Sequence, residues 1–158
     1  MRSFAARGLA IAMVLLAIAP ALAAEWGSIA PGKSTIESVR ATYGQPTRQN
    51  TQKVDGYDTT EWLYEGDRAP RGLQRLAVDF GLLTPAGYRP DLVRTMRLDP
   101  VPGVFTRETV LLGWGKPHRV GKEGDAPLFF YQDGLVVFFD KDGWLASRLL
   151  FTPPQPNP

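Results

Sequence analysis

The chain contains one formally complete phosphate-binding motif and few other residues that could do chemistry. Residues 27–34 match the pattern Gly-x-x-x-x-Gly-Lys-Ser, in which backbone amides and Lys33 would hold nucleotide phosphates between a strand and a helix. Only residues 24–26 of the expected exported chain precede this segment, which leaves no room for the strand. At the corresponding positions 71 residues later, residues 104–105 are Val-Phe, so a repeated fold does not require Lys33. We therefore interpret 27–34 as a turn that leads into a helix.

The remaining candidates do not add up to a catalytic or metal site. His118 is the single histidine and there is no cysteine, so a zinc site would need carboxylate or water ligands around it. No serine lies in a Gly-x-Ser-x-Gly elbow that could pair with this histidine. Residues 140–143, Asp-Lys-Asp-Gly, lack the later ligands of a calcium loop and are typical of a hairpin turn. Glu61 and Glu65 would lie about 13 Å apart along a strand, too far apart for glycoside hydrolysis. We expect no enzymatic activity, no catalytic residue, no metal and no cofactor.

Both ends of the chain predict segments outside the folded part. Residues 1–23 combine an early basic pair, an apolar run over 9–18 and the small-x-small sequence Ala21-Leu22-Ala23, which is typical of a cleaved secretory signal peptide. Without cysteine the exported chain cannot carry a lipid anchor. We expect a soluble periplasmic protein. Residues 152–158, with four prolines, predict a disordered Pro-rich tail.

The charge of the expected mature chain is balanced. The full chain has 18 Lys and Arg against 16 Asp and Glu, but Arg2 and Arg7 belong to the predicted signal. The remainder has no excess of either sign, so it builds no field that nucleic acid or an anionic membrane would select. No later apolar stretch is long enough to span a bilayer. We expect a protein partner from the cell envelope, no nucleic acid and no integral membrane segment after cleavage.

An internal repeat organises the rest of the chain. Residues 31–48 and 102–119 align without a gap, and eight of the eighteen positions are identical. In each copy a threonine suited to capping a helix, Thr35 or Thr106, is followed nine positions later by a helix-stopping glycine, Gly44 or Gly115. Each copy therefore predicts a short helix of about ten residues.

Strand-like sequences follow each predicted helix. They are residues 61–65, 73–82 and 92–98 in the first copy, and 128–131, 135–140 and 144–151 in the second, with a longer loop over 49–60. The predicted fold class is α+β: two tandem α-β-β-β modules, 24–100 and 101–151, forming an antiparallel sheet with short helices packed on one face.

These features resemble a known family. The turn, helix and Gly-x-Pro stop of residues 32–46 and 103–117, with the aromatic strands at 62–64, 130–131 and 138–139, resemble the SmpA/OmlA (BamE-like) domain family. The tandem arrangement is similar to the β-lactamase-inhibitor-protein fold, in which two such modules share one sheet. The resemblance implies a non-enzymatic protein-binding scaffold of the bacterial envelope, with a possible link to outer-membrane assembly or integrity.

Aromatic residues crowd the predicted strands, and one face of each strand would be exposed unless something covers it. From this density we predict a partner-binding surface consisting of Trp62, Tyr64, Arg97, Tyr131, Phe138 and Arg148. Two alternatives to the scaffold stay open: an enzyme inhibitor that offers a concave aromatic sheet, and a periplasmic carrier of a small molecule or lipid. The sequence does not identify the partner, the oligomeric state or the exposed face of the sheet.

Overall fold

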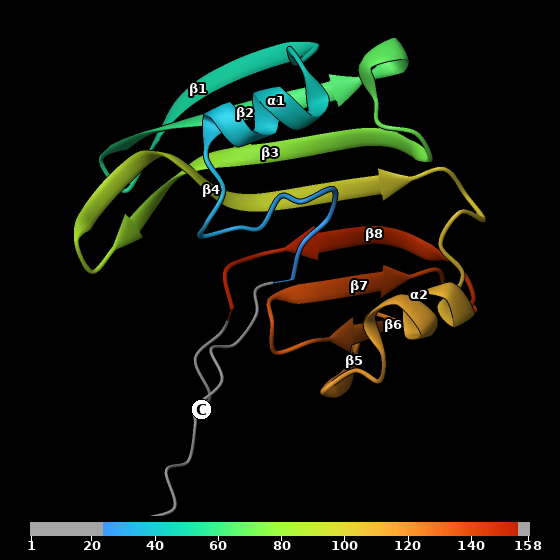
Figure 1. Ribbon diagram of the computed structural model, residues 1–158. Coiled ribbons are helices and arrows are strands. Elements are labelled where there is room, and N and C mark those ends of the chain that lie inside the picture. Colours follow the sequence, from blue (N-terminus) through green and yellow to red (C-terminus); the bar gives the residue numbers. More distant parts are fainter. Residues whose placement is uncertain (1–23, 155–158) are drawn as a thin grey trace, which may run out of the picture.

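The computed structural model describes residues 24–154, which form one antiparallel sheet with two short helices (Figure 1). The predicted signal, 1–23, lies outside the described residues, as do residues 155–158 of the predicted tail. The elements in chain order are α1 (Ile36–Tyr43), β1 (Arg48–Val54), β2 (Tyr57–Glu65), the 3-10 turn η1 (Gly66–Arg68), β3 (Leu73–Thr84), β4 (Gly87–Pro100), α2 (Arg107–Trp114), β5 (Arg119–Glu123), β6 (Ala126–Phe130), β7 (Leu135–Phe139) and β8 (Ala146–Phe151).

The predicted fold class is wrong. The eight strands form a single sheet in the order β1-β2-β3-β4-β8-β7-β6-β5, so β4 and β8 join the two halves at its centre. They pair over Met96–Leu98 and Leu149–Phe151. Four strands follow each helix instead of three, and each helix has only eight residues. The chain is therefore mostly β-sheet and not an α+β pair of α-β-β-β modules.

The two unpredicted strands, β1 and β5, lie at the edges of the sheet. Every residue of β1 except Val54 is exposed, so its sequence shows no apolar alternation. Its strand conformation is set by the Asp55-Gly56 turn, where both residues have positive φ, 53° and 84°. Such a two-residue turn matches the twist of a hairpin and pairs β1 with β2 over its whole length. Polar edge strands of this kind also discourage unwanted sheet pairing.

The two helices begin and end where the sequence predicts. Thr106 accepts a hydrogen bond from the amide of Thr109 at 3.2 Å and so caps α2. Gly44 and Gly115 follow the last helical residues with the same φ of 76°, which residues with a Cβ rarely adopt. These local signals are short in range, which is why the repeat in the sequence located both helices correctly.

At the C-terminus of each helix, the helix-ending glycine accepts a hydrogen bond from a tyrosine of the sheet. The hydroxyl of Tyr64 on β2 donates to the carbonyl of Gly44 at 3.0 Å. The hydroxyl of Tyr131, just after β6, donates to the carbonyl of Gly115 at 3.1 Å. The rings are buried against the helix side of the sheet, so the bonds satisfy helix-end carbonyls that lack an intrahelical partner.

The chain after β8 is also held in place. The amide of Thr152, the first residue of the predicted tail, donates to the carbonyl of Gly134 at 2.8 Å. Gly134, in the turn between β6 and β7, has a φ of 101°. A Cβ at this position would overlap the carbonyl oxygen of Thr152, so the close approach of the two segments requires glycine.

Among residues 24–154 no helix has the length and apolar character needed to cross a membrane.

The tyrosine bonds predict a measurable loss of stability. Tyr64→Phe and Tyr131→Phe keep the ring in the core but leave the glycine carbonyl unpaired, so each should lower the free energy of unfolding by about 1–2 kcal/mol. Tyr57→Phe is the control, because this half-exposed ring stacks on Tyr88 while its hydroxyl makes no hydrogen bond within the described chain. Urea denaturation measures all three. Equal stability of Tyr64→Phe and the unchanged protein would contradict the role of the bond.

Burial of these hydroxyls also predicts an alkaline instability. Burial raises the pKa of Tyr64 to about 12, against a value near 10 in the unfolded chain. Because the folded pKa is the higher one, this contribution is fully present below about pH 10 and is lost as the pH rises toward about 12. Unfolding free energies between about pH 8 and pH 11.5 should fall less steeply for Tyr64→Phe than for the unchanged chain. Parallel curves would exclude ionisation of Tyr64 as a cause.

The turn at Gly134 allows a matched comparison of two glycines. Gly124 also has a positive φ, 60°, but no atom lies near an added Cβ. We expect Gly124→Ala to cost about 1 kcal/mol for its backbone conformation alone. Gly134→Ala should cost at least about 3 kcal/mol, because the Thr152 carbonyl must also move away. Thermal unfolding of the two variants tests this order, and a similar Tm for both would contradict it.

Candidate binding face

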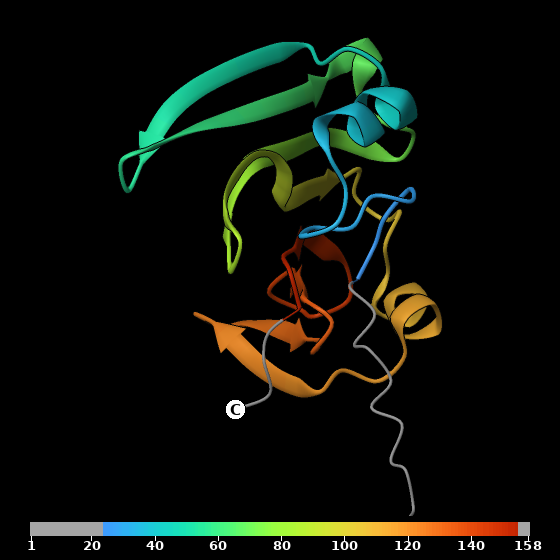
Figure 2. The ribbon, with the colours of Figure 1, turned by 60° about the vertical axis from the view of Figure 1, so that its left-hand side comes forward.

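The two faces of the sheet differ in what covers them. Figure 2 shows α1, α2 and the segment 24–35 on the same side of the sheet. Side chains alternate between the faces along each strand, so residues two apart share a face. We call the side without helices the helix-free face.

Three of the six predicted binding residues do not lie on this face. Trp62, Tyr64 and Tyr131 point toward the helices, and only 2%, 0% and 8% of their surfaces are exposed. The guanidinium of Arg40 on α1 lies 5.2 Å from the Trp62 ring centre, which confirms the direction of that ring. These three aromatics are part of the core, so in the folded chain they present no exposed ring to a partner.

The other three predicted residues do share the helix-free face. Phe138 on β7 is the cross-strand partner of Arg148 on β8, and Leu150 pairs with both Val136 and Arg97. Because Arg148 and Leu150 are two apart on β8, all five side chains lie on one face. The structure thus brings Arg97, Phe138 and Arg148 together from three strands.

The β5–β8 half of the face is apolar, with arginines over two of its rings. The guanidinium of Arg148 lies 3.7 Å from the centre of the Phe138 ring, and that of Arg119 lies 4.6 Å from Phe130. Arg148 also pairs with Glu123 at 3.6 Å. We call this surface the aromatic half-face; its apolar side chains are Leu128, Phe130, Val136, Phe138 and Leu150.

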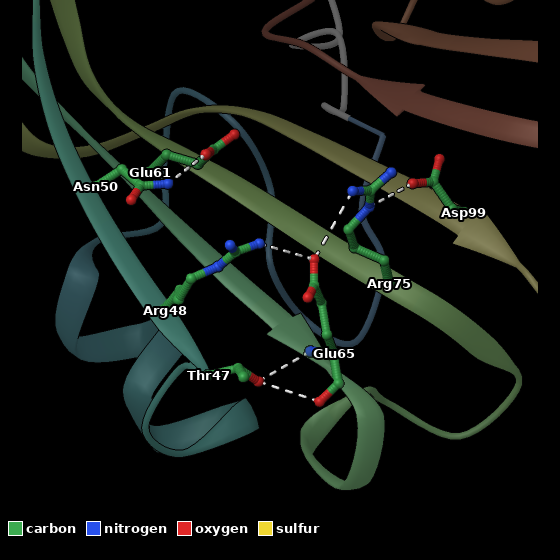
Figure 3. Close-up of polar contacts among 7 residues, drawn as sticks. All are labelled: Thr47, Arg48, Asn50, Glu61, Glu65, Arg75 and Asp99. Carbon is green, nitrogen blue, oxygen red and sulfur yellow. Dashed lines mark hydrogen bonds and ion pairs between the residues drawn. The ribbon is translucent and has the colours of Figure 1, made fainter.

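The β1–β4 half is polar and internally paired (Figure 3). Arg75 on β3 lies between two carboxylates, with Nε 2.8 Å from Asp99 and Nη1 3.7 Å from Glu65. Arg48 on β1 approaches the same Glu65 oxygen at 3.4 Å. The bond to Asp99 raises the pKa of Arg75 above its usual value, so the guanidinium stays charged.

A shallow hollow lies within the polar half. Its volume is about 260 Å³, and its lining residues are Glu65, Gln74, Arg75 and Asp99. Arg75 is 44% exposed, so solvent screens its ion pairs and they contribute little to stability. Arg75 is the cation that lines the hollow, and its charge is already paired with Asp99 and Glu65.

Arg97 lies at the boundary between the two halves. It is half-buried at the centre of the sheet, on β4, opposite Ala77 of β3 and Leu150 of β8. Within residues 24–154 no carboxylate forms an ion pair with it. An arginine stays charged at every physiological pH, so this position presents a permanent cation beside the aromatic half-face.

In the segment that matches the phosphate-binding motif, the backbone amides of residues 32–34 donate to carbonyls of the chain. The amides of Lys33 and Ser34 both donate to the carbonyl of Ala30, at 3.2 and 2.9 Å. The amide of Gly32 donates to the carbonyl of Val93 on β4 at 2.8 Å. These are the donors that a phosphate would need. Because the chain itself uses them, the segment acts as a turn that anchors the entry to α1.

The other candidates from the sequence have structural roles as well. His118 is exposed, and its amide donates to the carbonyl of Phe130 at 2.8 Å. Asp140 Oδ1 accepts from the amides of Trp144 and Leu145, at 2.8 and 3.2 Å, which fits the hairpin-turn interpretation. Among the described residues, no three His, Asp or Glu side chains gather as metal ligands would.

Two apolar residues of the aromatic half-face, Leu128 and Phe130, were not predicted as binding residues, although the sequence contains a signal for them. They alternate with Phe129 on β6, so both faces of this strand are apolar. Such strands are typically covered on both sides. Choosing the uncovered side required knowing where the helices pack, which Tyr131 reveals through its bond to Gly115.

Comparison with known proteins identifies no family. No protein-family model matches the chain, and no curated protein does. Among solved structures, the chain is similar to a DUF4309 family protein, YjgB, from Bacillus subtilis subsp. subtilis str. 168. The TM-score is 0.47 and the sequence identity 17%, over 80% of this chain and 82% of the other.

Proposed function

We propose that the protein is an exported, non-enzymatic scaffold of the bacterial cell envelope that binds a protein partner on its aromatic half-face. The observation that carries the proposal is the pair of apolar faces on β6, β7 and β8. One is buried by α2 and the core; on the other, Leu128 is 8% exposed and Phe130, Val136, Phe138 and Leu150 are half-buried, with no helix packed over them. An apolar sheet face without a cover marks an interaction surface in a folded protein.

The charges around this surface indicate the chemistry of the partner. Arg97, Arg119 and Arg148 surround the apolar side chains, and Glu123 is the acidic residue paired among them. Aromatic rings and arginines are the residues that contribute most to protein–protein affinity. The proposed partner therefore places apolar side chains on Phe130 and Phe138 and a carboxylate near Arg97.

The charges of the polar half would help to orient the partner on the face. Apart from Arg97 at the boundary, the polar half has Arg48 and Arg75 beside four acidic residues, Glu61, Glu65, Asp79 and Asp99. A partner acidic enough to pair with Arg97 would be repelled from this half. Such unequal charge contributes to specificity and orientation more than to affinity.

The proposal predicts a partner whose binding depends on named face residues. Cross-linking and pull-down from envelope extract would recover a stoichiometric protein with the unchanged chain. Phe138→Ala and Arg97→Glu should each weaken the measured affinity for that protein at least about tenfold. Lys33→Glu, an exposed charge reversal in the segment 24–35 on the helix side of the sheet, is the matched control and should bind as before. Trp62→Ala and Tyr131→Ala are unsuitable, since both side chains belong to the core.

Two outcomes would refute the scaffold. Equal affinity of Phe138→Ala, Arg97→Glu and the control would show that the partner binds elsewhere. Recovery of a lipid or metabolite in place of a protein would favour the carrier. If the recovered partner is an enzyme whose activity the unchanged chain blocks, the same face acts as an inhibitor surface.

A further inference from the structure

The first described residue, Ala24, is buried against the turn that contains Asp133. Ala24 is only 4% exposed, and its amide donates to the backbone carbonyl of Asp133 at 2.8 Å. Asp133 belongs to the turn between β6 and β7. The residues at the start of the folded part and this distant turn are therefore in direct contact.

The carboxyl group of Asp133 is incompletely satisfied. Its Oδ1 atom is buried and accepts no hydrogen bond from any described residue, while the backbone amides of Asp133 and Leu135 donate to the carboxyl group. Burial raises the pKa of this carboxyl, which shows that the surroundings disfavour its charged form. A buried acceptor without a donor is costly, so a positive or hydrogen-bond-donating group at Oδ1 would stabilise the folded chain.

We propose that proteolytic processing between Ala23 and Ala24 supplies that group, as a new N-terminal ammonium that pairs with Asp133. Hydrolysis adds one water molecule to the peptide bond. The carbonyl of Ala23 gains the hydroxyl and leaves as a carboxylate, while the nitrogen of Ala24 gains the protons and becomes an ammonium at neutral pH. The amide at this position donates one hydrogen bond, whereas the ammonium donates three. One can stay on the Asp133 carbonyl while another reaches the carboxyl of the same residue.

The burial of Ala24 also sets the order of events. Ala24 is covered and hydrogen-bonded in the folded chain, so the proposal requires the cut to precede folding, as it does when a leader is removed during export. The fold then closes around the new terminus.

The first test is the mass of the exported protein. The full-length chain, expressed with its leader in a bacterium and purified from the periplasm, should begin at Ala24 by intact mass and N-terminal sequencing. A main terminus at any other residue would overturn the proposal. This result does not depend on whether the aromatic half-face binds a partner.

The second test separates the ion pair from the structure of the turn. A glycine inserted between Ala23 and Ala24 keeps the small-x-small cleavage sequence, but the mature chain then starts one residue earlier and displaces its ammonium. Asp133→Asn, which keeps an acceptor in the turn, is made in both backgrounds. The substitution should lower Tm by roughly 4 °C more in the chain that starts at Ala24 than in the extended chain. Equal losses in both would show that Asp133 acts only within its turn.

Discussion

The hydrogen bond between a tyrosine on or just after a strand and the carbonyl of a helix-ending glycine is the contact that fixes each helix to the sheet. Helices of eight residues are not stable alone, so α1 and α2 exist because they are fixed to the sheet. The bonds from Tyr64 to Gly44 and from Tyr131 to Gly115 fix both helices to the same side. By covering that side, they also determine which face of the sheet is left without helices.

The sequence predicts an element well when the contacts that form it lie close together in the chain. Helix ends depend on contacts within a few residues, so Thr106 and Gly115 were readable from spacing alone. The edge strand β1 has no apolar alternation, and its one local signal, the Asp55-Gly56 turn, lies inside what the sequence suggested was a loop. The pairing of β4 with β8 joins segments about fifty residues apart, and no local pattern specifies it. The fold class was wrong for this reason.

Aromatic density does not distinguish a core from an interface, and the six residues predicted to bind a partner lie on both faces of the sheet: three in the core and three on the helix-free face. Trp62 is as aromatic as Phe138, but it packs edge-on against Phe80 beneath α1, whereas Phe138 lies under the guanidinium of Arg148. Only strand register separates the two environments, since residues one apart face opposite ways. The register became clear from long-range pairs such as Leu150 with Arg97.

The proposed terminus and the proposed binding face meet in the same hairpin. The turn that contains Asp133 joins β6 and β7, the strands that carry Phe130 and Phe138. A terminal ammonium held at this turn would restrict the hairpin from the helix side while the partner approaches the opposite face. Because that ammonium forms only when the leader is cut, the aromatic half-face would reach its full rigidity only in the exported chain. A rigid surface loses less conformational entropy on binding, which favours affinity without any added contact. Processing would thereby limit strong binding to the compartment where the partner is found.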